Sequence, residues 1–368
     1  MPPLRKALPL LVLVAWAPTA AAGPLTHEPC EDARAAEAFI STTLAMENLA
    51  FDGAGALYVS AKGVGVLAIT PAGDARTFAP ADAHGIVWRD ALYVNVPAAQ
   101  GRAVLRYEPD GTFETLVEGL PAHNGMAFDA EGNLYVSRHN TRPSIVRVPA
   151  GAPHEWAPWS DVYGANGLAY DGGNASLLVA VSLEQSSRIL RISLADPSDV
   201  RTVATLSLGG VSLEPGVASA PDPSAPARPK ALDDLTLGPD GNIYAAAFAT
   251  GEILRVDPRD GRACVVAADL QEPSSVRVAR GFGPYDGDLF VTAYGGTTGM
   301  GPLVPVAPPV QPAEGRPGLF RIPLGLALPG VGDDAASREP PHPQRAAAAP
   351  HAIVALLAAG LLARLARR

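Results

Sequence analysis

Hydrophobic and polar positions along the chain follow one short pattern that recurs six times. A polar residue precedes a short apolar run, a turn rich in Gly, Asp and Asn follows, and a second apolar run comes next. The clearest copy is Leu232–Tyr244, in which the turn Pro239-Asp240-Gly241 separates two apolar runs. Short apolar runs joined by turns of this kind predict pairs of β-strands.

The spacing of the copies predicts the fold. The polar residues that open them, called the leading residues below, are Glu47, His84, Asn124, Asn166, Asp233 and Ser274. Their intervals along the sequence are 37, 40, 42, 67 and 41 residues. A period near 40 with strand-and-turn content is typical of propeller blades. We therefore predict an all-β, six-bladed β-propeller over residues 36–325.

The residues before the first copy of the repeat indicate that the protein is exported and that an N-terminal strand closes the ring. Residues 1–22 combine a basic start, an apolar run and small residues before Gly23, which is typical of a secretory signal peptide. Residues 23–35 form a short N-terminal segment, and Ala36–Leu44 then reads as an isolated strand. We expect this strand to close the propeller by completing the last blade.

The chain after the propeller predicts an anchor. Residues 326–349 have the Pro- and Ala-rich composition of a linker, and residues 350–368 form an apolar tail with a basic end. The tail resembles bacterial C-terminal sorting tails, although its apolar core is shorter than the ~20 residues that comfortably span a bilayer. We expect an exported protein, periplasmic or at the cell surface, that this tail anchors or sorts. The alternative is an amphipathic terminal helix.

Two insertions interrupt the repeat. Residues 213–230 and 295–315 are rich in Pro and cannot hold regular strands. Each insertion is either a lid over one mouth of the channel or a surface loop without function.

Charge and cysteine content limit the partners. The formal net charge is -9, and no Lys/Arg run with interleaved aromatic residues is present, so nucleic acid is not expected as a partner. The two cysteines are Cys30 and Cys264. Export would permit a disulfide between them, since both would lie near outer strands, and two free thiols are the alternative because the sequence does not supply their distance. The oligomeric state stays open.

The leading residues define candidate chemistry. The first strand of each propeller blade lines the central channel, so two carboxylates, two amides, one imidazole and one hydroxyl would converge on the axis. Carboxylate and amide oxygens suit a hard cation such as Ca²⁺, whereas zinc fits poorly because the set holds no Cys and one His. Two carboxylates in one channel also repel unless a cation or a proton compensates. The alternative is that these side chains bond backbone groups at blade edges.

The chain resembles the calcium-dependent six-bladed propellers that include paraoxonases and the gluconolactonase–regucalcin group. The resemblance covers residues 36–325 and implies one axial calcium. Glu47, Asn166 and Asp233 match the ligand positions of those families. Asn124 matches an Asn that is a ligand in paraoxonases and contacts substrate in gluconolactonases, and Asp234 stands where paraoxonases place an Asn ligand.

The sequence Ala83-His84-Gly85-Ile86 carries the likeness to paraoxonases, and it implies that His84 is the base that activates water. This chain departs from that family in two respects. Val96 stands where the helper histidine is expected. Asn48 and Gly125 stand where a second, buried calcium would need acidic residues.

These observations predict an exported, calcium-dependent hydrolase of small-molecule lactones or esters. The metal would polarise the carbonyl and stabilise the oxyanion, and an imidazole suits proton transfer near neutral pH. Asp233 is the alternative base, as in gluconolactonase-like members. The sequence has no Gly-x-Ser-x-Gly elbow, which argues against a serine hydrolase. The rival hypothesis is a non-catalytic exported propeller that binds a ligand or a protein partner.

Overall fold

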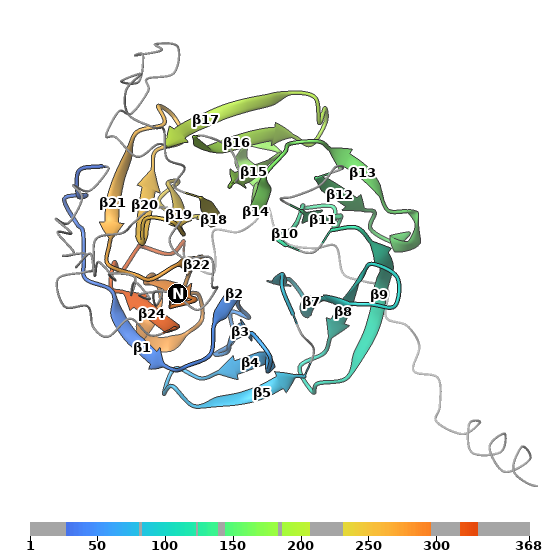
Figure 1. Ribbon diagram of the computed structural model, residues 1–368, viewed down its shortest axis with the longest axis horizontal. Helices are drawn as coiled ribbons and strands as arrows, with labels where there is room; N and C mark the ends of the chain where they lie inside the picture. The colour runs from blue at the N-terminus through green and yellow to red at the C-terminus, as the bar shows by residue number, and fades with distance from the viewer. Residues whose placement is uncertain are drawn as a thin grey trace, which may run out of the picture. The chain divides into compact units, whose positions relative to one another are not determined.

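The computed structural model describes residues 27–80, 83–122, 124–138, 144–182, 186–206, 231–295 and 317–329. Within these ranges the chain forms six four-stranded antiparallel sheets and three short 3₁₀ helices. The sheets are arranged as blades around a central axis (Figure 1). The predicted all-β, six-bladed propeller is confirmed.

Each blade runs outward from its first strand. Blade one is β2 (Met46–Phe51), β3 (Leu57–Ala61), β4 (Gly65–Ile69) and β5 (Ala75–Ala79). Blade two is β6 (Ile86–Trp88), β7 (Leu92–Pro97), β8 (Arg102–Tyr107) and β9 (Phe113–Leu120). Blade three is β10 (Met126–Phe128), β11 (Leu134–Ser137), β12 (Ile145–Val148) and β13 (Ala157–Ser160), with η1 (Pro153–Glu155) before its last strand.

The second half repeats the plan. Blade four is β14 (Ala165–Asp171), β15 (Ser176–Val181), β16 (Ser187–Ser193) and β17 (Val200–Leu206), with η2 (Gly172–Asn174). Blade five is β18 (Leu232–Leu237), β19 (Ile243–Ala247), β20 (Glu252–Val256) and β21 (Ala263–Ala267). Blade six is β22 (Pro273–Val278), β23 (Leu289–Ala293) and β24 (Gly318–Ile322), with η3 (Gly283–Tyr285) and, as its outer strand, β1 (Glu37–Ser41).

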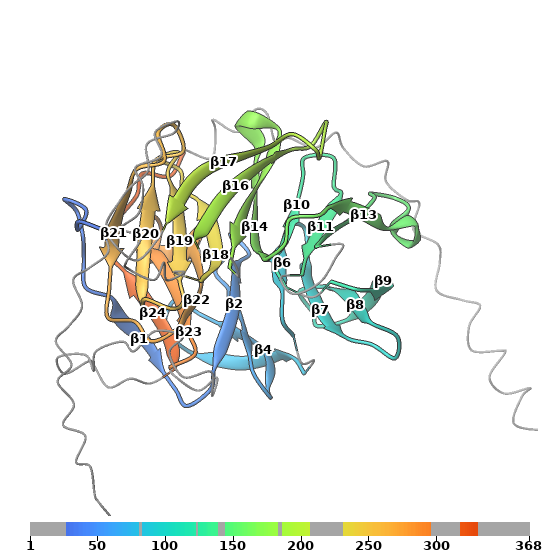
Figure 2. The same ribbon diagram turned by 45° about the horizontal axis from the view of Figure 1, so that its top comes forward.

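The first strands form an inner ring. β2, β6, β10, β14, β18 and β22 lie nearest the axis, and each contacts the first strand of the next blade, with β22 contacting β2 (Figures 1 and 2). The leading residues lie in or just before these strands, so the topology brings segments far apart in sequence to one centre.

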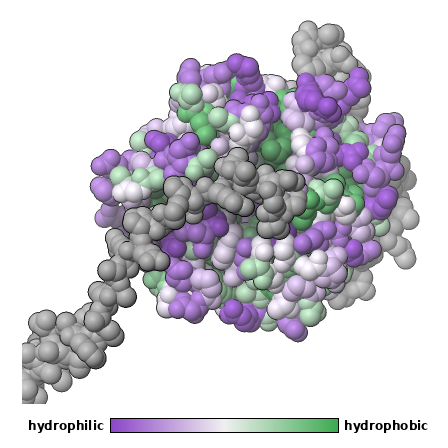
Figure 3. Space-filling model, turned by 180° about the vertical axis from the view of Figure 1, so that it is seen from behind, coloured by the Kyte–Doolittle hydropathy of each residue, from purple (hydrophilic) through white to green (hydrophobic). Residues whose placement is uncertain are grey.

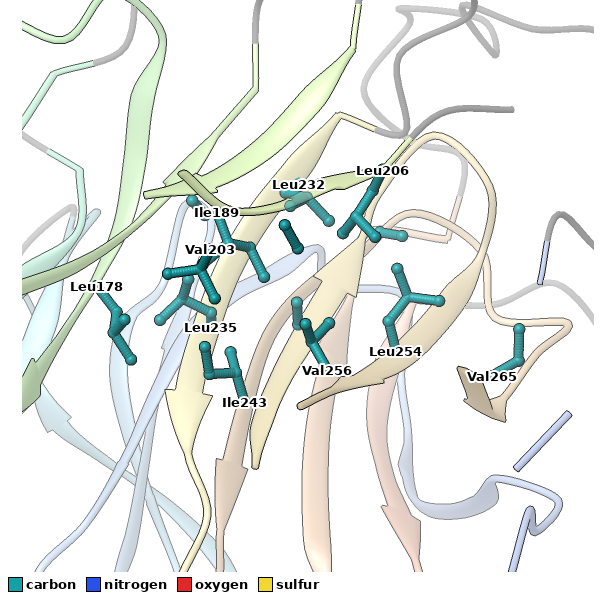
Figure 4. Close-up of a cluster of buried hydrophobic side chains, with 14 residues drawn as sticks. Leu178, Ile189, Val203, Leu206, Leu232, Leu235, Ile243, Leu254, Val256 and Val265 are labelled. Atoms are coloured by element: carbon teal, nitrogen blue, oxygen red, sulfur yellow. The ribbon is translucent and has the colours of Figure 1, made fainter. Parts of the chain in front are cut away.

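Apolar side chains fill the spaces between blades. Between blades four and five, Leu178 and Ile189 pack against Leu235, Ile243 and Leu254, all of them buried (Figure 4). Burying one such side chain stabilises a fold by roughly 1.5–3 kcal/mol. On the face shown in Figure 3, hydrophilic residues predominate around the rim and apolar residues gather only in small patches.

The N-terminal strand lies in the last blade. β1 pairs antiparallel with β24, and the Phe39 ring contacts the rings of Phe282, Tyr285 and Phe290 at centroid distances of 6.1, 5.4 and 5.0 Å. The strand therefore has the predicted partner. That it holds the ring closed stays a prediction.

A disulfide joins Cys30 to Cys264 on β21, with Cα atoms 5.0 Å apart. The Cys30 N–H donates to the Val265 carbonyl at 2.9 Å, and Arg255 donates to the Asp32 carboxylate at 2.7 Å. Of the two alternatives for the cysteines, the structure shows the pair. The disulfide attaches the N-terminal segment to blade five before β1 enters blade six.

Several predicted segments lie outside the described residues. They are residues 1–22, most of 326–349, all of 350–368, residues 213–230, and all but Gly295 of 295–315. Within the part of the chain that the structure describes, no helix has the length and apolar character needed to cross a bilayer.

Removing the disulfide should destabilise the propeller. The bond spans 234 residues of sequence, and cross-links that close long loops contribute on the order of 2–5 kcal/mol. The Cys30→Ser/Cys264→Ser double variant should therefore unfold at a lower temperature in a calorimetric scan. A reductant should lower the wild-type Tm but leave the double variant unaffected. Equal Tm values for the oxidised wild type and the double variant would contradict this.

Candidate active site

A backbone irregularity recurs where the leading residues lie. In β2 the pairing with the second strand shifts register between Met46 and Leu49, and β14 and β18 shift at the equivalent place. The shifts bracket Glu47, Asn166 and Asp233. A β-bulge re-aims side chains and is common next to active sites. The bulges therefore release these three residues from the regular alternation of their strands.

Glu47 and His84 lie together. His84 Nδ1 is 3.7 Å from Glu47 Oε2, and the side chains are 29% and 18% exposed. The Tyr294 hydroxyl also donates to Glu47 Oε2. The structure thus brings the predicted ligand of blade one to the predicted base of blade two.

Asn166 and Asp233 form a second pair. Asn166 Nδ2 donates to Asp233 Oδ1 at 2.5 Å and to Ser182 Oγ at 2.9 Å. These bonds use the amide nitrogen, so the side-chain carbonyl oxygen is the atom that a cation would take.

Glycines let neighbouring first strands approach closely. A Cβ at Gly85 would lie 2.0 Å from the Asn124 carbonyl oxygen, and one at Gly125 would lie 2.4 Å from that of Asn166. A Cβ at Gly167 would lie 2.5 Å from the Cα of Asp234. Each glycine follows a leading residue because only a residue without Cβ fits against the next blade. The buried Asn124 is placed in the ring by this packing.

The structure separates Asp233 from its neighbour Asp234. The buried Asp234 carboxylate accepts from Arg277 at 2.6 Å, from the Leu235 N–H at 2.8 Å and from the Ser275 hydroxyl. These contacts anchor Asp234 to blade six. Its role as a metal ligand stays a prediction, one that would require the ion pair to open.

The leading residue of blade six has a backbone partner. The buried Ser274 hydroxyl donates to the Met46 carbonyl at 2.8 Å. This contact matches the alternative interpretation, in which a leading side chain bonds a blade edge.

Two residues near Glu47 were not predicted from the sequence. Tyr294 directly follows β23, and the Lys62 ammonium lies 5.3 Å from the centre of its ring. A sequence signal exists, because Lys62 follows Ser60 by two residues just as Tyr294 follows Thr292. The ends of second strands therefore face the site as well as the first strands do.

The pKa values of the Asp233 and Glu47 carboxyl groups are shifted in opposite directions. Burial raises the pKa of Asp233 well above its ordinary value, and the charges of Glu47 and Asp234 raise it further against the Asn166 hydrogen bond. Burial also opposes ionisation of Glu47, but His84, Tyr294 and Lys62 outweigh it, and the pKa of Glu47 is lowered. Burial and the Glu47 charge raise the pKa of Tyr294, so it remains a donor. Perturbed carboxyl groups of this kind are typical of functional sites.

The donor set fits a hard cation in its chemistry. Glu47 and Asp233 would offer carboxylate oxygens, and Asn124 and Asn166 would offer amide oxygens. A divalent cation would also offset the repulsion that burial intensifies between the carboxylates. Within the described ranges no group of three or more His, Cys, Asp or Glu side chains is arranged to hold a metal. The amide oxygens would therefore be needed to complete the shell.

Comparisons with known proteins find likeness in structure alone. No family and no curated protein matches the sequence. A gluconolactonase from Xanthomonas campestris matches with a TM-score of 0.54 and 18% identity, over 75% of this chain and 96% of that one. A second structure, of a protein described as a putative gluconolactonase, matches with a TM-score of 0.54 and 14% identity, over 84% and 99%. These matches establish the fold.

A third match shows that a shared fold does not imply a shared reaction. The aldose sugar dehydrogenase of Streptomyces coelicolor, solved with bound PQQ, has a TM-score of 0.52 and 16% identity, over 77% of this chain and 96% of that one. One fold can host unrelated reactions. The reaction must therefore be argued from the residues at the centre.

The Asp234–Arg277 ion pair yields a prediction about stability. Asp234→Asn should destabilise the protein by about 3–5 kcal/mol, because it leaves a largely buried guanidinium without its counter-charge. The Asp234→Asn/Arg277→Met double variant should recover part of the loss, as chemical denaturation would show. Additive losses from the two single substitutions would contradict the coupling.

Proposed function

We propose that the protein is a calcium-dependent hydrolase of lactones or esters. The observations that carry the proposal are two pairs beside the inner strands, Glu47 with His84 and Asn166 with Asp233, and the effect of the Glu47 charge on the pKa of Asp233. The structural likeness to gluconolactonases supports a small-molecule lactone as substrate. Glu47, Asn124, Asn166 and Asp233 would hold the metal.

The chain's own residues supply the proton chemistry. A bound calcium would polarise the substrate carbonyl and stabilise the oxyanion. His84 presents Nδ1 to Glu47, and we assign removal of the water proton to Nε2, on the opposite side of the ring. The water oxygen then bonds to the carbonyl carbon, the acyl–oxygen bond breaks, and the leaving oxygen receives the proton. The Glu47 carboxylate would stabilise the imidazolium that forms in between.

We also propose that the protein is exported and attached to a membrane through residues 350–368. The signal-like sequence of residues 1–22 supports export, and so does the Cys30–Cys264 disulfide, since disulfides persist mainly in oxidising compartments.

Metal binding should depend on the carboxylates of Glu47 and Asp233. Asp233→Asn and Glu47→Gln each remove a charge from the proposed shell, so calcium affinity measured by calorimetry should fall ~10-fold or more. Asp240→Asn is the matched control, because it makes the same chemical change in an exposed turn of blade five, and its calcium affinity should stay near that of the wild type. An equal loss in Asp234→Asn would place that residue in the shell. Unchanged affinity in Asp233→Asn and Glu47→Gln would refute the site.

Substitution of His84 should lower the rate of hydrolysis without lowering the affinity for calcium. His84→Gln removes the base and should lower turnover of lactones or aryl esters by ~10²–10⁴-fold, the usual contribution of general-base catalysis. Calcium affinity should change little. His154→Gln is the control, since that side chain is 80% exposed.

Two other outcomes would change the assignment. Intact turnover in His84→Gln would make Asp233 the preferred base. A calcium-saturated wild type that hydrolyses nothing in a broad panel would favour the non-catalytic binding module.

A further inference from the structure

Blade six lies between the two carboxylate-bearing blades but contributes no leading carboxylate. Its first strand contacts both β2, which carries Glu47, and β18, which carries Asp233. Its leading residue, Ser274, donates its hydroxyl to the backbone of blade one. The Ser274 hydroxyl is thus bonded to the backbone, and a different side chain of blade six contacts the Glu47 carboxylate.

The end of β23 provides that side chain. The Tyr294 hydroxyl donates to Glu47 Oε2, and two residues earlier the Thr292 hydroxyl donates to the Glu47 carbonyl at 2.6 Å. One strand thus holds both the backbone and the carboxylate of Glu47. A glutamate side chain otherwise has several rotamers of similar energy, so a second attachment point restricts it.

Tyr294 is itself held on three sides. Its ring meets Phe248, which follows β19 of blade five, at a centroid distance of 5.9 Å and an angle of 70°. Lys62 of blade one lies over the ring, and the Tyr294 N–H donates to the Glu272 carbonyl at 3.1 Å. The residue is only 6% exposed. A hydroxyl on so well fixed a ring can orient a carboxylate.

We infer that Tyr294 is a positioning residue that fixes the Glu47 carboxylate for calcium, an inference that rests on the proposed function. Residues that hydrogen-bond a metal-ligating carboxylate set its orientation, and their loss typically costs 10–100-fold in metal affinity or activity. Tyr294 acts through Glu47 and need not touch the substrate.

The test compares two Tyr→Phe substitutions. Tyr294→Phe removes the hydroxyl and keeps the ring against Phe248 and Lys62. Tyr244→Phe is the matched control, because its hydroxyl also donates to a carboxylate, that of Asp240 at 2.9 Å, in a turn of blade five. Calorimetric titration with calcium should show ~10–100-fold weaker binding for Tyr294→Phe and wild-type affinity for Tyr244→Phe.

The outcomes separate this inference from the proposed function. A wild type that binds no calcium overturns both. A wild type that binds calcium, with Tyr294→Phe binding equally well, overturns the inference alone. Weaker binding in both Tyr→Phe variants also overturns it, because the effect would then be a general loss of stability. If Tyr294 acts only through the metal, lactone or ester hydrolysis by Tyr294→Phe should approach the wild-type rate once calcium is saturating.

Discussion

The propeller depends on hydrogen bonds beside the axis that, within the described residues, cross from five of the six blades to the next. Buried polar side chains at the ends of second strands donate to backbone carbonyls of the following blade. The pairs are Ser60 with His84, Asn95 with Ala122, Ser137 with Asn166, Ser182 with Leu232 and Thr292 with Glu47. A buried carbonyl without a partner costs about 1–3 kcal/mol, so these bonds stabilise the interfaces. They also fix the backbone from which the leading side chains extend.

The recurrence of this arrangement explains why the fold and most of the candidate site could be predicted. Equivalent first strands must meet at the axis, so a polar residue that opens each repeat is placed by topology alone. A glycine directly after three of these residues, at Gly85, Gly125 and Gly167, marks the close packing of neighbouring first strands. The hydrophobic pattern and the period of the repeat therefore predict where the leading residues lie.

The remaining contacts could not be predicted, because they depend on pairings between distant segments. Asp233 and Asp234 are adjacent and chemically alike, yet one meets Asn166 and the other meets Arg277. Their directions follow from a bulge in β18 and from a cation on the next blade. Tyr294 contacts Glu47 across 247 residues of sequence, and its position in the repeat does not by itself identify Glu47 as its partner.

At the bulges, two adjacent residues have different roles: one bonds the next blade and the other contacts polar side chains beside the axis. A rigid ring can therefore also hold a polar centre. In blade one Asn48 donates to the His84 carbonyl at 2.8 Å while Glu47 meets His84 and Tyr294. In blade five Asp234 bonds Arg277 of blade six, while Asp233 accepts from Asn166 of blade four. A regular strand would send such neighbours to opposite faces of the sheet. The bulge instead lets Asn48 and Asp234 join two blades, while Glu47 and Asp233 contact other polar side chains beside the axis.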